Sequence, residues 1–282
     1  EVFGNAGSGQ HYFGWQAHDA VEQARKHIAS YFHVHSSQVI FTSGATESNN
    51  LAIKGFLSTL KPGHIITSAI EHKAVLEVFK DVESFGWQVT YLSPTVDGEI
   101  SIESVRRAII PGQTSFISLM WVNNELGTIN PIQDIIDVCK EYGIIFHSDA
   151  TQALGKLAIP TGDLPDLISF SGHKLYSPKG IGGLVVKKGI HLHPQILGGG
   201  QERNIRSGTL AVQQIVALGV SFLRLPVYLS HIERLMQYQK SIETTFSTHF
   251  SNKICINGFK QLRVPHILNI TLKDLDWENM FR

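Results

Sequence analysis

The chain has 282 residues, of which 43% are hydrophobic and 17% charged, as expected for a globular protein rather than a disordered or fibrous one. Lys plus Arg and Asp plus Glu both number 24, so the formal net charge is zero, which argues against a broad basic surface for nucleic acid or anionic membrane. No apolar run reaches the roughly 20 residues that span a bilayer, so we expect neither direct nucleic-acid binding nor membrane insertion.

The elements expected along the first two thirds of the chain are short strands that alternate with helices. Helical spacing of apolar residues predicts helices at 15–32, 46–60, 73–86, 101–110 and 132–143. Apolar, β-branched runs predict strands at 39–44, 64–70, 88–94, 114–122, 144–151, 166–173 and 182–189. Such alternation predicts an α/β domain, in which helices cover both faces of a largely parallel sheet.

The pattern changes after about residue 209. A helix is expected at 209–225 and a more polar helix at 228–248, followed by strand-like runs at 253–258 and 267–272. This part of the sequence predicts the beginning of a smaller α+β unit.

Polar residues gather where the predicted strands end. They are Ser43 to Thr46, Glu71-His72, Asn123-Asn124, Asp149 to Gln152, and Ser171 to Lys174. Because ligands of open α/β sheets bind beyond the carboxyl ends of the strands, these residues are the candidate site.

Lys174 and Asp149 indicate the chemistry of this site. Lys174 is either a solvated loop lysine or an amine in a partly dry cleft, where desolvation favours the neutral, nucleophilic form. Asp149 is either a cap or turn residue, or a carboxylate facing a protonated ring nitrogen, as pyridoxal phosphate requires. Gln152 and Asn124 offer hydrogen bonds to a ring oxygen.

The other groups fit the same cofactor. Ser43 to Thr46 join a strand to a helix, either as an ordinary cap or as a phosphate-binding helix start. His72 is either a surface histidine or an imidazole lying against the cofactor ring. The Gly-Ile-Gly-Gly run at 180–183 does not fit a dinucleotide fingerprint, so the residues favour pyridoxal phosphate over a nucleotide.

Several motifs, in order along the chain, resemble the NifS/IscS-type cysteine desulfurases. They are "FGWQAHDAVEQAR" (13–25), "TSGATESNNLAIKG" (42–55), "EHKAVL" (71–76), "VNNELG" (122–127), "DATQALGK" (149–156), "SFSGHKLYSPKGIGG" (169–183) and "GGGQERNIRSGT" (198–209). This family is part of the class V branch of the aminotransferase-like, pyridoxal-phosphate-dependent enzymes of fold type I.

The resemblance implies a mainly parallel seven-stranded sheet with helices on both faces, plus an incomplete smaller α+β domain. We therefore expect residues 14–209 to form the large cofactor-binding domain. Residues 210–282, with 1–13, are expected to form a partial small domain and the connecting helix.

The resemblance also implies roles for the residues around the cofactor ring. Lys174 resembles the lysine that bonds to the cofactor aldehyde, and His72 the histidine that stacks on the ring; these two are the expected catalytic residues. Asp149 resembles the partner of the ring nitrogen, and Gln152 and Asn124 the ligands of the ring oxygen.

A second group resembles the family's contacts to the phosphate and to the lysine loop: Ala45, Thr46, Ser171 and His173. Thr209 resembles a phosphate ligand that the second subunit donates, which implies a homodimer because each site then borrows from its neighbour.

The implied reaction takes sulfur from L-cysteine and leaves L-alanine and a persulfide on a protein cysteine. The persulfide sulfur then passes to an iron–sulfur scaffold or another sulfur-acceptor protein, or to tRNA thiolation. With two cysteines and no disulfide framework, the chain is expected in a cytoplasmic or organellar-matrix compartment.

The sequence departs from the family at both ends. It has no Ser-Ser-Gly-Ser-Ala-Cys loop with the nucleophilic cysteine, no C-terminal arginine for the substrate carboxylate and no N-terminal Asn-Ala-Ala-Thr-Thr. Cys139 is expected in a helix core and Cys255 in a structural strand position, and neither is assigned as the nucleophile. Because the chain begins at Glu1 and ends at Arg282, we expect that both ends are missing; the alternative is an inactive remnant that binds the cofactor.

Two other functions remain open. One is a different class V enzyme, such as a selenocysteine lyase or an aminotransferase, which needs no protein thiol; the other is a non-enzymatic dimeric binding module. His33 with His35, and His191 with His193, offer pairs of imidazoles on predicted strand faces, but no third ligand is apparent and no metal is expected.

Overall fold

The elements follow the order that the sequence predicts. The computed structural model describes residues 3–250 and 253–273. The helices are α1 (Tyr12–Tyr31), α2 (Ala45–Leu57), α3 (Lys73–Glu83), α4 (Ile102–Ala108), α5 (Ile132–Tyr142), α6 (Val212–Leu223), α7 (Leu225–Leu229) and α8 (Ile232–Phe250). The strands are β1 (Val39–Thr42), β2 (His64–Ser68), β3 (Gln88–Leu92), β4 (Thr114–Ser118), β5 (Ile145–Asp149), β6 (Leu167–Ser171), β7 (Gly182–Val186), β8 (Ile254–Ile256) and β9 (Ile270–Leu272).

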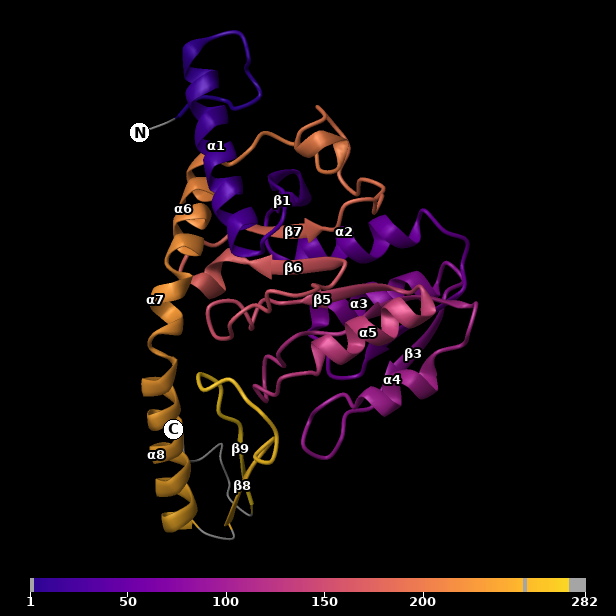
Figure 1. Ribbon diagram of the computed structural model, residues 1–282, viewed down its shortest axis with the longest axis vertical. Helices are drawn as coiled ribbons and strands as arrows, with labels where there is room; N and C mark the ends of the chain where they lie inside the picture. The colour runs from indigo at the N-terminus through magenta and orange to yellow at the C-terminus, as the bar shows by residue number, and fades with distance from the viewer. Residues whose placement is uncertain (1–2, 251–252, 274–282) are drawn as a thin grey trace.

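The central sheet has seven strands in the order β1-β7-β6-β5-β4-β2-β3 (Figure 1). The pairs β6-β5, β5-β4, β4-β2 and β2-β3 are parallel, whereas β7 runs antiparallel to both of its neighbours. The expected α/β class and the mainly parallel seven-stranded sheet are therefore confirmed.

The strands are buried on both faces, which explains their continuous apolar runs. Neighbouring residues point to opposite sides: Ile66 and Ile168 belong to a core cluster shared with α1, α5 and α6. Ile65 and Leu167 belong to a second cluster shared with α2 and α3. Helices thus cover both faces of the sheet, as predicted.

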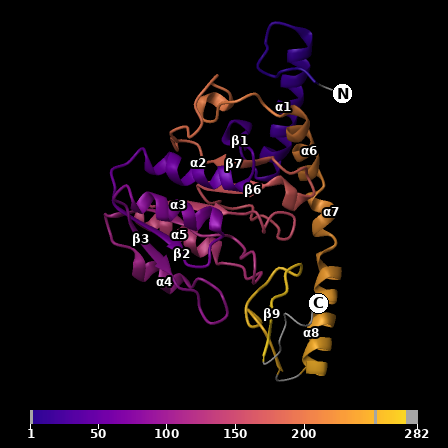
Figure 2. The same cartoon turned by 180° about the vertical axis from the view of Figure 1, so that it is seen from behind.

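The segment after residue 209 runs along one side of the molecule. Figures 1 and 2 show α1 and α6 side by side, with α7 and α8 continuing the column. Gly219 of α6 lies so close to α1 that an added Cβ would come within 2.7 Å of Ala24. The helix expected at 228–248 is α8, which a short α7 with Pro226 at its start separates from α6.

The strands β8 and β9 pair antiparallel in a separate sheet beside α8 (Figure 1). Of the expected small domain at 210–282 with 1–13, residues 1–2, 251–252 and 274–282 lie outside the described residues. No described helix is by itself long and apolar enough to cross a membrane, although α6 together with residues Leu225–Phe250, a pair bent by 45°, meets the criteria of length and composition.

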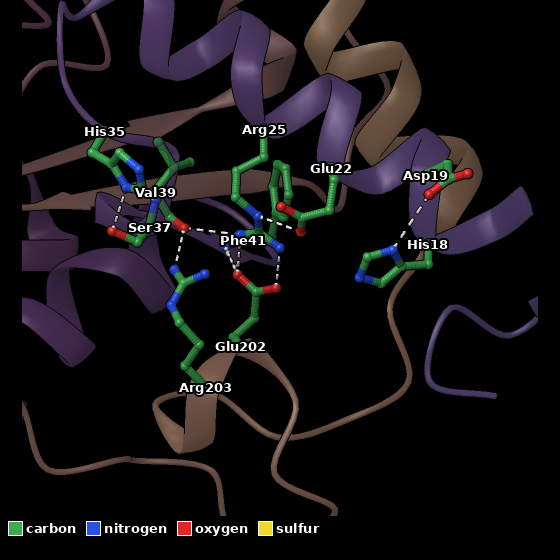
Figure 3. Close-up of polar contacts among 10 residues, drawn as sticks. All are labelled: His18, Asp19, Glu22, Arg25, His35, Ser37, Val39, Phe41, Glu202 and Arg203. Carbon is green, nitrogen blue, oxygen red and sulfur yellow. Dashed lines mark hydrogen bonds and ion pairs between the residues drawn. The ribbon is translucent and has the colours of Figure 1, made fainter. Parts of the chain in front are cut away.

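A buried ion pair attaches the loop at 198–209 to the outermost strand of the sheet, β1 (Figure 3). The guanidinium of Arg25, on α1, donates from Nη1 and Nη2 to the two carboxylate oxygens of Glu202, both at 2.7 Å. The two side chains are 3% and 1% exposed. The buried charges are therefore paired with bidentate geometry, the arrangement that compensates best for their desolvation.

The same ion pair also provides hydrogen-bond partners for the backbone of the outermost strand. Because β1 is the outermost strand, its outward backbone groups have no strand partner. Glu202 accepts from the Phe41 N–H at 2.8 Å, and the Val39 carbonyl accepts from Arg25 at 2.8 Å and from Arg203 at 2.9 Å (Figure 3). Positive φ angles at Glu202, Arg203 and Asn204, of 46°, 57° and 64°, cost roughly 1 kcal/mol each, and these hydrogen bonds offset that cost.

We predict that Glu202→Gln lowers the free energy of unfolding by about 3 kcal/mol, because it leaves the buried Arg25 charge without its main counterion. Denaturant unfolding followed by circular dichroism measures the change. Glu77→Gln is the matched control, since Glu77 pairs with Lys80 where both side chains are more than half exposed. It should cost less than about 1 kcal/mol; equal losses in the two variants would contradict the role given to the buried pair.

Candidate active site

A pocket of about 540 Å³ opens at the carboxyl ends of the parallel strands. Its lining comes from the ends of β1, β2, β4, β5 and β6 and the residues that follow them. The lining residues are Ser43, Gly44, Ala45, Thr46, Glu47, His72, Ala74, Met120, Val122, Asn124, Asp149, Thr151, Gln152, Ser171, His173, Lys174, Lys179 and Gly180. The structure thus brings together every residue for which a cofactor or catalytic role was predicted, except Thr209.

Lys174 lies on a tight turn at the end of β6. A 3₁₀ helix, Gly172–Leu175, follows the strand directly and projects the Lys174 side chain to the pocket. Gly172 allows the close packing there, because a Cβ would lie only 3.0 Å from the Ile181 side chain and carbonyl. The sharp turn therefore places a lysine beyond the strand end instead of continuing the strand.

Lys156 supports this turn from outside the pocket lining. Its Nζ donates to the Lys174 carbonyl at 2.6 Å. Burial lowers the pKa of Lys156 to about 8, and the positive charge of Lys174 adds to the shift. Burial also lowers the pKa of His266 to about 4, with contributions from the same two lysines. His266 lies 3.3 Å from the Gln152 Oε1, so one edge of the pocket carries a group of nitrogen bases.

Asp149 is a buried acid of the pocket lining. It ends β5 and is only 6% exposed. Its Oδ2 accepts from the Asn49 Nδ2 at 2.8 Å and its Oδ1 from the Thr151 N–H at 2.9 Å. These two bonds fix the orientation of the carboxylate, which suits a partner for a protonated ring nitrogen.

Two buried atoms beside Asp149 still need partners. The Asn49 Oδ1 and the Thr151 Oγ1 are buried without a hydrogen bond among the described residues. Buried polar atoms are normally satisfied, and the pocket lies next to them. A polar heterocycle with its own donors and acceptors fits this environment, whereas an apolar ligand would leave these atoms unsatisfied.

Glu71 lies behind the pocket and is the second buried acid. Its Oε1 accepts from Ser68 Oγ at 3.0 Å and from the Met120 N–H at 2.8 Å. Burial raises the pKa of Glu71 to about 8, and the negative charge of Asp149 adds to the rise. At neutral pH Glu71 is therefore mostly uncharged.

A buried histidine below the pocket is also neutral. His147 lies between Ser118 and Ser169, with ring nitrogens 2.8 and 2.9 Å from their hydroxyls. Burial lowers the pKa of His147, so the ring stays neutral. Sequence reasoning missed this residue because its apolar strand neighbours gave no sign of the hydroxyls on the adjacent strands.

The loop between β1 and α2 forms a cup for an anion. α2 begins at Ala45, and no side chain of the described residues caps its N-terminus. The first N–H groups of a helix have no intrahelical acceptor, so those of Ala45 and Thr46 face the pocket together with the dipole of a 13-residue helix. Gly44, with a φ of 154°, makes the turn possible.

The remaining predicted residues differ in how firmly they are held. His72 caps α3, with its Nδ1 accepting from the Ala74 N–H at 3.0 Å, and its side chain is exposed. The Ser171 Oγ lies 2.8 Å from the His173 Nδ1. Asn124 is half-buried in the pocket wall. Thr209 is exposed and outside the pocket of its own chain.

The two cysteines lie away from the pocket lining. Cys139 is buried in α5, as expected, and burial raises the pKa of its thiol to about 12, to which Asp166 adds. Cys255 lies in β8, as expected, but its side chain is exposed, so it does not pack in a core.

The histidine pairs do not have the expected strand geometry. His33 lies in a turn with a positive φ, His35 caps a 3₁₀ helix, and His191 and His193 lie in a loop. Among residues 3–250 and 253–273, no group of three or more His, Cys, Asp or Glu side chains could hold a metal ion.

Sequence reasoning also missed Asn49 and Lys156 as supports of the pocket, and it named Glu71 without recognising a buried acid. Asn49 and Lys156 lie inside two of the quoted motifs, "TSGATESNNLAIKG" and "DATQALGK", so the motifs contained the signal. Their partners are 100 and 18 residues away in the sequence, which spacing alone does not reveal.

The sequence matches one known family and its relatives over almost the whole chain. Residues 1–282 match the aminotransferase class V family. The chain is 45% identical to the cysteine desulfurase IscS of Mannheimia succiniciproducens and 44% identical to that of Methylococcus capsulatus. Each alignment covers 99% of this chain and 70% of the relative.

Solved structures show the same fold. A NifS-like protein superposes with a TM-score of 0.93 at 32% identity, covering 99% of this chain and 77% of that one. SspA in complex with cysteine has a TM-score of 0.88 at 40% identity, covering 99% and 79%. DndA from Streptomyces lividans has a TM-score of 0.88 at 39% identity, covering 99% and 80%.

The matches confirm the resemblance that the motifs indicated, and with it pyridoxal phosphate as the cofactor of the family. They extend over almost the whole of this chain, so they include every strand end that lines the pocket. The chain belongs to the class V aminotransferase family, in its NifS/IscS-type cysteine desulfurase branch.

Proposed function

We propose that this chain acts as a cysteine desulfurase that takes sulfur from L-cysteine. The observation that carries the proposal is the meeting of Lys174, Asp149 and the start of α2 at one pocket. The substrate C–S bond breaks and the sulfur forms an S–S bond with a protein thiol, so that L-cysteine and the thiol become L-alanine and a persulfide. The persulfide sulfur serves iron–sulfur cluster assembly or tRNA thiolation.

The residues fit pyridoxal phosphate at both ends of the pocket. Asp149 would hold the ring nitrogen, Gln152 and Asn124 the ring oxygen, and Ala45, Thr46, Ser171 and His173 the phosphate and the lysine turn. When bound, the cofactor supplies an electron sink for the electrons released at the substrate Cα.

The protein's own residues orient the substrate and move its protons. The Lys174 amine would bond to the cofactor until substrate arrives and then remove the proton from the substrate Cα. His72, at the opening of the pocket, would lie against the ring and transfer a proton near the leaving sulfur. Met120 and Val122 provide an apolar wall that excludes water from the reacting atoms.

The thiol that accepts the sulfur is not assigned to either cysteine. Cys139 is 2% exposed and its raised pKa disfavours the reactive thiolate. Cys255 is exposed but lies on β8, outside the pocket lining. This favours, as a second candidate, a class V enzyme that needs no thiol, such as a selenocysteine lyase or an aminotransferase. Formation of L-alanine from L-cysteine with a protein persulfide distinguishes the desulfurase from both.

A homodimer is part of the proposal. Thr209 is exposed and does not line the pocket of its own chain, and Leu197, just before the loop at 198–209, is 81% exposed. An apolar side chain and a hydroxyl exposed together suit an interface in which the loop reaches the pocket of a second copy.

The proposed organisation has two domains. Residues 14–209 contain the large sheet and every residue of the pocket lining, and residues 210–282 with 1–13 form the partial small domain. A cytoplasmic or organellar-matrix location is proposed, supported by the absence of a disulfide between the two cysteines, both of which lie in the described residues.

The first of three predictions about the pocket concerns Lys174. Lys174→Ala should abolish both the visible absorption band of the bound cofactor and its covalent trapping by borohydride, because the amine that bonds to the aldehyde is lost. Lys179→Ala is the matched control, since Lys179 lines the same pocket and should keep both signals. Trapping that persists in Lys174→Ala would refute the assignment.

The second prediction concerns Asp149. Asp149→Ala should still take up pyridoxal phosphate but should slow the exchange of the α-proton of L-alanine with deuterated water by at least about 100-fold, since the ring nitrogen loses its charged partner. Proton NMR measures the exchange. A rate like that of the unsubstituted chain would disprove the contact with the ring nitrogen.

The third prediction tests the shared site. Thr209→Ala should weaken cofactor binding about tenfold, because a hydrogen bond to a charged phosphate is lost. Mixed dimers of Thr209→Ala and Lys174→Ala subunits should regain one unaltered site, with tight binding and borohydride trapping. If Thr209 acted within its own subunit, the sites that borohydride can trap would all lack Thr209 and would still bind the cofactor about tenfold more weakly.

A further inference from the structure

An acidic residue lies at the end of α2 where the phosphate is expected. Glu47, in the first turn of the helix, lines the pocket beside Gly44, Ala45 and Thr46, and its side chain is 16% exposed. The positive end of a helix stabilises a nearby carboxylate as it does a phosphate. An ionised Glu47 therefore competes with, and repels, an anion bound at the same N–H groups.

Arg206 neutralises this carboxylate. Its Nε donates to the Glu47 Oε1 at 2.7 Å and its Nη2 to the Oε2 at 3.2 Å. The Arg206 side chain is 21% exposed, so solvent screens the pair only partly. Burial opposes ionisation of Glu47, yet the bonds from Arg206 and Ser43 and the charge of Arg206 hold its pKa below the usual value.

The pair also fixes the direction of the carboxylate. The Glu47 Oε2 accepts from the Ser43 N–H at 2.8 Å. Glu47 is thus turned back toward Ser43 and Arg206, and the N–H groups of Ala45 and Thr46 keep their free direction into the pocket.

We propose that Arg206 is a positioning residue for the phosphate-binding end of α2: by pairing with Glu47, it cancels the charge that would repel the cofactor phosphate. The inference rests on the proposed function, because it takes the bound anion to be the phosphate of pyridoxal phosphate. It adds a role for the loop at 198–209, which would serve the pocket of its own chain through Arg206 as well as the neighbouring pocket through Thr209.

The loop is held for this role by a separate attachment. The buried pair between Arg25 and Glu202 fixes the loop to α1 and β1, four residues before Arg206 in the sequence. β1 leads directly into Ser43 and Gly44, so the loop and the cup are built on the same strand.

A charge-reversal cycle tests the proposal. Binding of pyridoxal phosphate to the cofactor-free chain is measured by equilibrium dialysis for Arg206→Met, Glu47→Gln and the double variant. Arg206→Met should bind at least about tenfold more weakly, because an unpaired carboxylate then faces the phosphate across a partly buried site. The double variant should return to within about threefold of the unsubstituted chain, since Gln keeps the acceptor for Ser43 without the charge.

Inorganic phosphate provides a second readout without the cofactor ring. Its ability to compete with pyridoxal phosphate should fall in Arg206→Met and recover in the double variant. Arg203→Met is the matched control, because Arg203 lies on the same loop but bonds to the Val39 carbonyl and does not line the pocket. It should bind the cofactor within about threefold of the unsubstituted chain.

These measurements distinguish a failure of the proposed function from a failure of the role given to Arg206. If the unsubstituted chain takes up no pyridoxal phosphate, the proposed function fails. If it binds the cofactor but the double variant stays as weak as Arg206→Met, or Arg203→Met is weakened equally, the loss comes from the loop conformation and the role of Arg206 is overturned. If Arg206→Met does not fold, Glu47→Gln decides: binding at least as tight as the unsubstituted chain supports the proposal, and weaker binding overturns it.

Discussion

The pocket depends on one geometrical constraint: the carboxyl ends of parallel strands lie along the same side of their sheet. β2, β4, β5 and β6 run side by side in one direction, so the residues that follow them meet although they are far apart in the sequence. Asp149 and Lys174 come from neighbouring strands in this way. Because helices cover both faces of the sheet, a ligand can enter at the carboxyl ends of the strands.

The electrostatics of the pocket follow from burial. Asn49 and the Thr151 N–H hold Asp149 in place through hydrogen bonds, whereas burial drives Glu71 and His147, behind and below it, towards their neutral forms. The nitrogen bases Lys156 and His266 lie near Lys174 and Gln152. The pocket thus combines a firmly held carboxylate with amines and imidazoles, an arrangement suited to a cationic heterocycle that also carries an aldehyde.

The loop at 198–209 shows how a strained segment can be kept ordered. Its three consecutive positive φ angles are unfavourable for residues other than glycine. Glu202 lies in that run, yet its carboxylate accepts a hydrogen bond from the outward backbone of β1 and pairs with a buried arginine. The conformation that satisfies the sheet edge also brings Arg206 to Glu47 and leaves Thr209 exposed. One segment thereby serves both the packing of the fold and the charge pairing beside the start of α2.

The sequence by itself determined the order and type of the elements, because helical and strand periodicities are local and the strands here are apolar throughout. It also determined the residues at the strand ends, among them Lys174, Asp149, His72 and the cup from Ser43 to Thr46, since these interrupt apolar runs with polar groups. Only the tertiary structure decided the pairs that set charge and direction: Asn49 with Asp149, Arg206 with Glu47, and Arg25 with Glu202. These partners are separated by 100, 159 and 177 residues. Whether two distant side chains meet depends on the folding of everything between them, so no local pattern in the sequence could have shown it.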